Sequence, residues 1–136
     1  MSLIEWNDDW LIGHPAIDYD HKMLVTITNQ LYDAYCGAPL DQELVRRSLE
    51  QLVSYVERHF AREEEVFLST DYPNKDGHLS MHRQLEGVVR DIAITFDREE
   101  GLLDLDEVID FLKRWLVQHI RKHDFGYRAY LKTEAA

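Results

Sequence analysis

Apolar residues recur at steps of three and four along four stretches of the chain, which is the spacing of one face of an α-helix. The first stripe contains His21, Val25, Thr28, Leu31 or Tyr32, and Tyr35. The second contains Leu49, Leu52, Val56, His59, Glu63 and Phe67. The third contains His78, His82, Leu85, Val89, Ile92 and Phe96. The fourth contains Val108, Leu112, Trp115 and His119. The pattern therefore predicts four amphipathic helices.

Turn-forming residues separate these stretches. Gly37 and Pro39 follow the first, Pro73 lies after the second, and Gly101 follows the third. We expect helices at about 18–36, 41–69, 76–97 and 104–123, with Asp18 capping the first. Residues 1–17 form an irregular N-terminal arm. Because the connections are short, the predicted fold is all-α, an antiparallel up-down-up-down four-helix bundle.

Composition and charge narrow the possible functions. The chain has 136 residues, 45% of them hydrophobic, which is sufficient for one domain with a single core. Its formal net charge of -11 would repel phosphate backbones and anionic lipid headgroups, so we expect no nucleic-acid or membrane partner. The chain shows no secretory signal or membrane span, and its single cysteine, Cys36, cannot form an internal disulfide. These features predict a cytoplasmic protein.

Polar residues that interrupt the apolar stripes are the most informative feature. They are His21, His59, Glu63, His78, His82 and His119. In an up-down-up-down bundle, the start of the first helix, the end of the second, the start of the third and the end of the fourth share one level. All six side chains should therefore meet in the core at one end of the bundle.

A metal site explains this convergence better than ordinary packing. Any one of these histidines would by default be a hydrogen-bonded core residue. Burying all of them without a common partner would cost roughly 1–3 kcal/mol or more for each unsatisfied group. Imidazole and carboxylate are suitable ligands for divalent iron, zinc or copper. The joint pattern predicts a metal centre.

The residues after His119 leave one ligand undecided. A four-residue step from His119 selects His123, whereas the five-residue step to Asp124 turns about 140° away on an ideal helix. Periodicity alone favours His123 and makes Asp124 a capping or surface residue. A local distortion at the helix end could reverse that choice.

The chain resembles the hemerythrin family, particularly its single-domain bacterial members (bacteriohemerythrins). The resemblance covers nearly the whole chain. It rests on Trp6, Gly13, Ile17-Asp18-x-x-His21, His59-Phe60-x-x-Glu63-Glu64, His78-x-x-x-His82 and Trp115-Leu116-x-x-His119-Ile120-x-x-x-Asp124, followed by Phe125 and Tyr127. Each motif is modest alone, but all of them in order are highly specific. The resemblance implies that residues 1–136 are a single hemerythrin-like domain.

The resemblance also implies a non-heme di-iron centre with a bridging oxo or hydroxo group. His78, His82 and His119 would bind one iron, and His21 with His59 the other. Glu63 and Asp124 would bridge the two irons, so the family pattern selects Asp124 over His123. Two departures from the family are visible: Asp20 stands where Gln is common, and His123 is an additional histidine. Either could tune the site through hydrogen bonds to the ligands.

Ligand counting then indicates the chemistry. If both irons are six-coordinate, the histidines, the bridging carboxylates and the bridging oxygen leave one position open, on the iron with two histidines. A small ligand binds at such an open position. The resemblance implies that this ligand is dioxygen, bound reversibly for storage, delivery or buffering. It places Leu116 and Ile120 near that position, with Trp115 and Leu85 close by; for the last two, simple core packing is an equal alternative.

Other functions remain open from the sequence. The same scaffold could serve a di-iron oxidase, a peroxidase, a nitric-oxide-handling enzyme or an O₂ or redox sensor. The expected helices contain no Glu-x-x-His ligand pair of the kind common in bundle di-iron oxidases, which argues against oxygen activation. A structural bundle with a zinc site is the simplest alternative. An unidentified reductase or oxygen-consuming enzyme is a possible partner.

Several polar or small residues are expected to have no special role. His14 should be solvent-exposed, and Glu64 and Glu65 should lie on a solvated helix face. Cys36 should be a buried thiol near a helix end.

Gly87, inside the third helix, suggests a close approach between helices.

Overall fold

Four α-helices dominate the computed structural model, which describes residues 3–37, 39–98, 104–120, 127 and 130–131. The helices are α1 (Pro15–Cys36), α2 (Gln42–Leu68), α3 (Lys75–Arg98) and α4 (Leu105–Gln118). A short 3₁₀ helix, η1 (Asp8–Trp10), lies in the N-terminal arm. The predicted all-α bundle with an N-terminal arm is confirmed.

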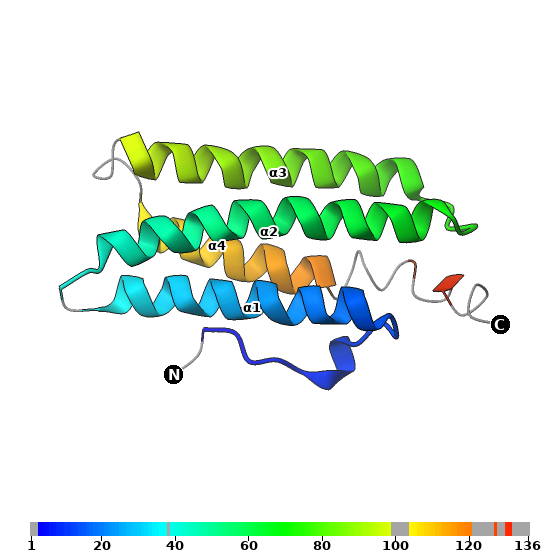
Figure 1. Ribbon diagram of the computed structural model, residues 1–136, viewed down its shortest axis with the longest axis horizontal. Helices are drawn as coiled ribbons and strands as arrows, with labels where there is room; N and C mark the ends of the chain where they lie inside the picture. Colours follow the sequence, from blue (N-terminus) through cyan, green and yellow to red (C-terminus); the bar gives the residue numbers. More distant parts are fainter. Residues whose placement is uncertain (1–2, 38, 99–103, 121–126, 128–129, 132–136) are drawn as a thin grey trace.

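Successive helices run in opposite directions, as Figure 1 shows. Helix α1 packs against α2 and α4, and α2 packs against α3. The start of α1, the end of α2, the start of α3 and the end of α4 consequently lie at one end of the bundle (Figure 1). We call this the site end, and the other the opposite end.

Side-chain caps determine where the helices begin. The carboxylates of Asp41 and Asp104 accept hydrogen bonds from the backbone N–H groups of Leu44 and Glu107, and so start α2 and α4. The start predicted for α1 was wrong. His14 caps this helix through its ring nitrogen and is half-buried, and Pro15 occupies the first turn, where its missing N–H is harmless.

Asp18 attaches the arm to α1 instead of capping the helix. Its buried carboxylate accepts hydrogen bonds from the backbone N–H of Ile12 at 2.8 Å and of Gly13 at 3.2 Å. Gly13 adopts a φ of 91°, which favours glycine, and this turns the chain into α1. The side chain of Asn29 holds the beginning of the arm by two hydrogen bonds to the backbone of Ile4.

Two apolar clusters form the described core. The larger runs along the bundle and contains the buried residues Leu24, Leu31, Leu49, Leu52, Val56, Phe60, Val89, Phe96, Leu112, Trp115, Leu116 and Ile120, among others. The smaller lies at the site end and consists of Ile12, Ile17, Phe67, Tyr72 and Tyr127. The apolar stripes of the sequence thus face the interior, and the polar residues on them are buried with their apolar neighbours.

Two expectations about single residues were wrong. Cys36 is exposed because it is the last residue of α1. Gly87 does not mark a close helix contact, since a Cβ added there would meet nothing within 4 Å. None of the helices in the described part of the chain combines the length and the apolar character that crossing a bilayer requires.

Candidate metal centre

The six polar residues predicted from the stripes meet at the site end. His21 comes from α1, His59 and Glu63 from α2, His78 and His82 from α3, and His119 follows α4. Each has a relative exposure of at most 2%. The helical register alone brings them together, because each occupies the interior face of its helix at the same level of the bundle.

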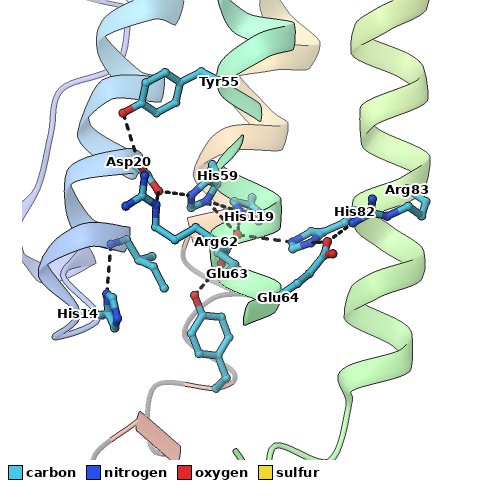
Figure 2. Close-up of polar contacts among 12 residues, drawn as sticks. His14, Asp20, Tyr55, His59, Arg62, Glu63, Glu64, His82, Arg83 and His119 are labelled. Atoms are coloured by element: carbon cyan, nitrogen blue, oxygen red, sulfur yellow. Dashed lines mark hydrogen bonds and ion pairs between the residues drawn. The ribbon is translucent and has the colours of Figure 1, made fainter. Parts of the chain in front are cut away.

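Glu63 lies at the middle of this cluster (Figure 2). Its Oε1 atom is 2.9 Å from Nε2 of His59, 3.2 Å from Nε2 of His119 and 3.5 Å from Nε2 of His82. Its other oxygen accepts a 2.6 Å hydrogen bond from the hydroxyl of Tyr127. Burial alone would raise the pKa of Glu63, but the charges and hydrogen bonds of His59 and His119 hold it well below the usual range. Glu63 is therefore an ionised carboxylate in the core.

Outer partners orient three of the imidazole rings. Nδ1 of His59 lies 3.2 Å from Oδ2 of Asp20, and Nδ1 of His82 lies 2.8 Å from Oε2 of Glu64. Nδ1 of His78 lies 3.4 Å from the hydroxyl of Tyr72. Because an ionised carboxylate only accepts, His59 and His82 donate from Nδ1. This leaves Nε2 of both rings for a metal, the arrangement in which proteins commonly hold metal-binding histidines.

The donors fall into two groups that share Glu63. One comprises His21, His59, Glu63 and His119, and the other Glu63, His78 and His82; within each group the ligand atoms lie within 4.8 Å of one another. The resemblance assigns His119 to the pair His78 and His82 instead. Its ring centre lies 5.6 Å from that of His59 and 5.8 Å from that of His82, so His119 stands between the two pairs.

Two local observations indicate that these donors are suited to binding a cation. The fully buried Nε2 atom of His82 has no hydrogen-bond partner among the described residues. His59 lies between two carboxylates, Asp20 at 3.2 Å and Glu63 at 2.9 Å, and one neutral imidazole cannot donate to both. A second proton on His59, or a metal ion bound by His59 and Glu63, resolves this conflict.

The end of α4 departs from ideal helix geometry. His119 and Ile120 are π-helical, although the backbone N–H of His119 still bonds to the carbonyls of Trp115 and Leu116. A π-helical segment is the kind of distortion that would favour a five-residue step from His119. Asp124 and His123, the two candidates for the next ligand, lie outside the described residues.

Apolar side chains surround the donors on the α4 side. Leu116 and Ile120 are fully buried, Trp115 is 9% exposed, and Leu85 is half-buried against the same cluster. The ring of Trp115 stacks on that of His119, with centres 5.7 Å apart. Trp115, Leu116 and Ile120 are therefore members of the larger core cluster, and Leu85, on α3, packs against it.

The comparisons with known proteins agree with this geometry. Residues 13–131 match the family model of the hemerythrin HHE cation binding domain. The chain belongs to the hemerythrin family. The resemblance drawn from the motifs is thereby confirmed, and the buried histidine and glutamate groups are those of a hemerythrin cation-binding domain, consistent with a site for two metal ions.

Named relatives align with most of this chain. It is 33% identical over 127 residues to the bacteriohemerythrin of Pseudomonas aeruginosa (strain LESB58), covering 93% of this chain and 80% of that protein. The bacteriohemerythrin of Stenotrophomonas maltophilia (strain R551-3) is 31% identical, with 98% and 84% covered. A crystal structure of wild-type hemerythrin superimposes with a TM-score of 0.84 at 29% identity, covering 96% of this chain and 98% of that one. The corresponding TM-score for a single-residue hemerythrin mutant is 0.86, at 27% identity.

Sequence reasoning anticipated that Asp20 could hydrogen-bond to a site histidine, but it missed two other outer partners, Glu64 and Tyr72. Glu64, expected to be solvated, has a side chain only 17% exposed and bonds to His82. Tyr72 was not considered, although it lies beside His78. The available signal was adjacency: Asp20 precedes His21 and Glu64 follows Glu63, so both occupy helical positions next to a candidate ligand. Periodicity could not indicate which histidine each would contact.

Proposed function

We propose that the chain binds dioxygen reversibly at a non-heme di-iron centre, for oxygen storage, delivery or buffering. The observation that carries the proposal is the convergence of five buried histidines on the ionised Glu63 within a hemerythrin fold. Two ferrous ions in this site would supply the two electrons that dioxygen takes up on binding and returns on release.

Each donor has a defined role in the proposal. His78, His82 and His119 would hold one iron, His21 and His59 would hold the other, and Glu63 and Asp124 would supply the carboxylates that the two irons share. The position of His119 between the two histidine pairs is compatible with its binding the same iron as His78 and His82. The π-helical residues at the end of α4 support a ligand five residues after His119 instead of four. Tyr127 fixes the orientation of the Glu63 carboxylate through its 2.6 Å hydrogen bond.

The chemistry of the donors favours binding over oxygen activation. Five neutral imidazoles contribute no negative charge, whereas carboxylate-rich sites stabilise highly oxidised iron. Leu116 and Ile120 are buried beside the histidines and would exclude water and larger molecules. A dry, mostly neutral site supports reversible uptake of a small apolar molecule.

The direct test is to load the metal-free protein anaerobically with ferrous iron, admit O₂ and then remove it. We expect two irons per chain and a visible charge-transfer band that appears with O₂ and bleaches on deoxygenation. His59→Ala should lose the band, because one iron keeps a single histidine. His14→Asn is the matched control: it removes a histidine outside the site, retains a capping side chain and should leave the band intact.

Three outcomes would contradict the proposal. Zinc instead of iron in the protein as isolated would favour a structural site. A band that never bleaches would indicate irreversible oxidation. Rapid turnover of peroxide or nitric oxide, lost in His59→Ala but kept in His14→Asn, would indicate an enzyme.

A further inference from the structure

Asp20 occupies the position directly before a ligand and contacts a second ligand from another helix. It lies on α1, and its Oδ2 atom accepts from Nδ1 of His59 on α2 at 3.2 Å. The residue thus connects to both histidines of one half of the centre: to His21 through the chain and to His59 through a hydrogen bond.

Three donors on one face of α2 hold the Asp20 carboxylate. The hydroxyl of Tyr55 donates to Oδ1 at 3.2 Å, and Nε of Arg62 lies 2.9 Å from Oδ2. Tyr55, His59 and Arg62 follow one another at steps of four and three, so they form a single helical stripe facing α1. Figure 2 shows all three directed at Asp20.

The carboxylate is buried and ionised. Its side chain is only 2% exposed. Donors from Tyr55, His59 and Arg62 surround both of its oxygens, which is the environment that an ionised carboxylate needs in the core. A buried negative charge at this distance acts strongly on the ring it contacts, because little solvent screens it.

The other half of the centre provides an internal comparison. There His82 donates to Glu64, which pairs with Arg83, so each half has one histidine backed by a carboxylate and an arginine. The two differ in shielding: the Glu64 side chain is 17% exposed and that of Asp20 is 2% exposed. Asp20 should therefore influence its histidine more strongly than Glu64 does.

We propose that Asp20 is a positioning residue that raises the metal affinity, and lowers the reduction potential, of the half containing His21 and His59. A carboxylate that accepts from Nδ1–H makes Nε2 a stronger donor and stabilises the higher charge on a bound metal. Arg62 opposes this effect by partly neutralising Asp20. The inference rests on the proposed metal centre, but it does not require that the centre bind oxygen.

The test uses two variants with opposite expected signs. Asp20→Asn keeps the shape and removes the charge; it should weaken binding of Co²⁺ at one of two sites about 10- to 100-fold, measured by competition with a chelator on the metal-free protein. In the iron-loaded protein its midpoint potential should rise, by about 59 mV if the one-electron equilibrium changes tenfold. Arg62→Gln should tighten Co²⁺ binding and lower the potential.

Two controls separate this effect from a change in surface charge or folding. Arg58→Gln removes the same charge one helical turn away, where the guanidinium contacts Ser54 and the ring of Tyr55 but does not pair with Asp20, and it should shift both quantities less than Arg62→Gln. Glu64→Gln should weaken the other Co²⁺ site. If Asp20→Asn does not fold, Arg62→Gln remains decisive, because Arg62 is exposed.

The proposal is overturned if Asp20→Asn and Arg62→Gln shift the potential in the same direction, or if Arg62→Gln changes neither quantity more than Arg58→Gln does. Opposite shifts in a protein that fails to bind O₂ reversibly would support the role of Asp20 while refuting the oxygen-binding function. Reversible O₂ binding by the protein, with no shift in metal affinity or potential in either variant, would support the oxygen-binding function while refuting the role of Asp20.

Discussion

The two ends of the bundle are built on different principles. At the opposite end, apolar side chains such as Leu31, Leu49, Phe96 and Leu112 fill the interior. At the site end, five histidines and Glu63 occupy the equivalent interior positions. The described buried polar groups nearer the opposite end are satisfied locally: Thr28 donates to the backbone of Leu24, and Ser48 accepts from Gln30.

The two ends therefore differ in whether their contribution to the stability of the fold depends on a bound proton or metal ion. Apolar packing at the opposite end stabilises the fold whatever the protein binds. The site end requires a proton or a metal ion among its donors, because His59 cannot donate to both Asp20 and Glu63 when neutral. The opposite end should therefore account for folding, whereas the site end should respond to the ligand.

The largest effect is expected from a cavity at the opposite end. Leu49 is 1% exposed, and Leu49→Ala should lower the free energy of unfolding by about 2–5 kcal/mol. Because Leu49 lies ten residues before His59, about 15 Å along α2, the loss should be equal with and without metal. Urea denaturation of both forms measures it. Leu68→Ala, at a 47% exposed position, is the control and should change stability by no more than about 0.5 kcal/mol.

Metal loading should produce the next largest change in the free energy of unfolding. This change should depend on residues at the site end alone. With free metal at about 100 times its dissociation constant, the free energy of unfolding should rise by roughly 3 kcal/mol. Glu63→Gln should abolish most of this gain, since it removes the carboxylate shared by both donor groups. Thermal unfolding with and without a chelator tests this. Glu65→Gln, an exposed change of the same type on α2, should retain the gain; equal losses in both variants would contradict the comparison.

A smaller effect is expected at Gly87, which contacts neither a ligand nor another helix closely. Gly87→Ala should stabilise the protein by about 0.5–1 kcal/mol, because alanine loses less backbone entropy in a helix and its Cβ meets nothing within 4 Å. The gain should be the same in the metal-free and metal-loaded forms, as measured by thermal unfolding. Gly13→Ala should instead be destabilising, because Gly13 has a φ of 91°.

The sequence by itself determined the four helices and six of the residues at the centre. Both follow from local periodicity: a three- and four-residue spacing identifies a helical face, and a polar residue on that face at the right level points to the core. His59 and Glu63 on one stripe, with His78 and His82 on the next, were sufficient to predict that the donors converge. The family motif added Asp124, which periodicity had passed over in favour of His123 and which lies outside the described residues.

Only the tertiary structure decided which side chains hydrogen-bond to the outer nitrogen atoms of these histidines. Asp20 reaches His59 from a different helix, and Glu64 turns toward His82, because the relative rotation of packed helices determines such contacts. A helical pattern records which face of its own helix is apolar, and contains no information about that rotation. The role of Asp18 in holding the arm depends likewise on its contacts with the backbone of Ile12 and Gly13, which form only when the arm turns back against α1.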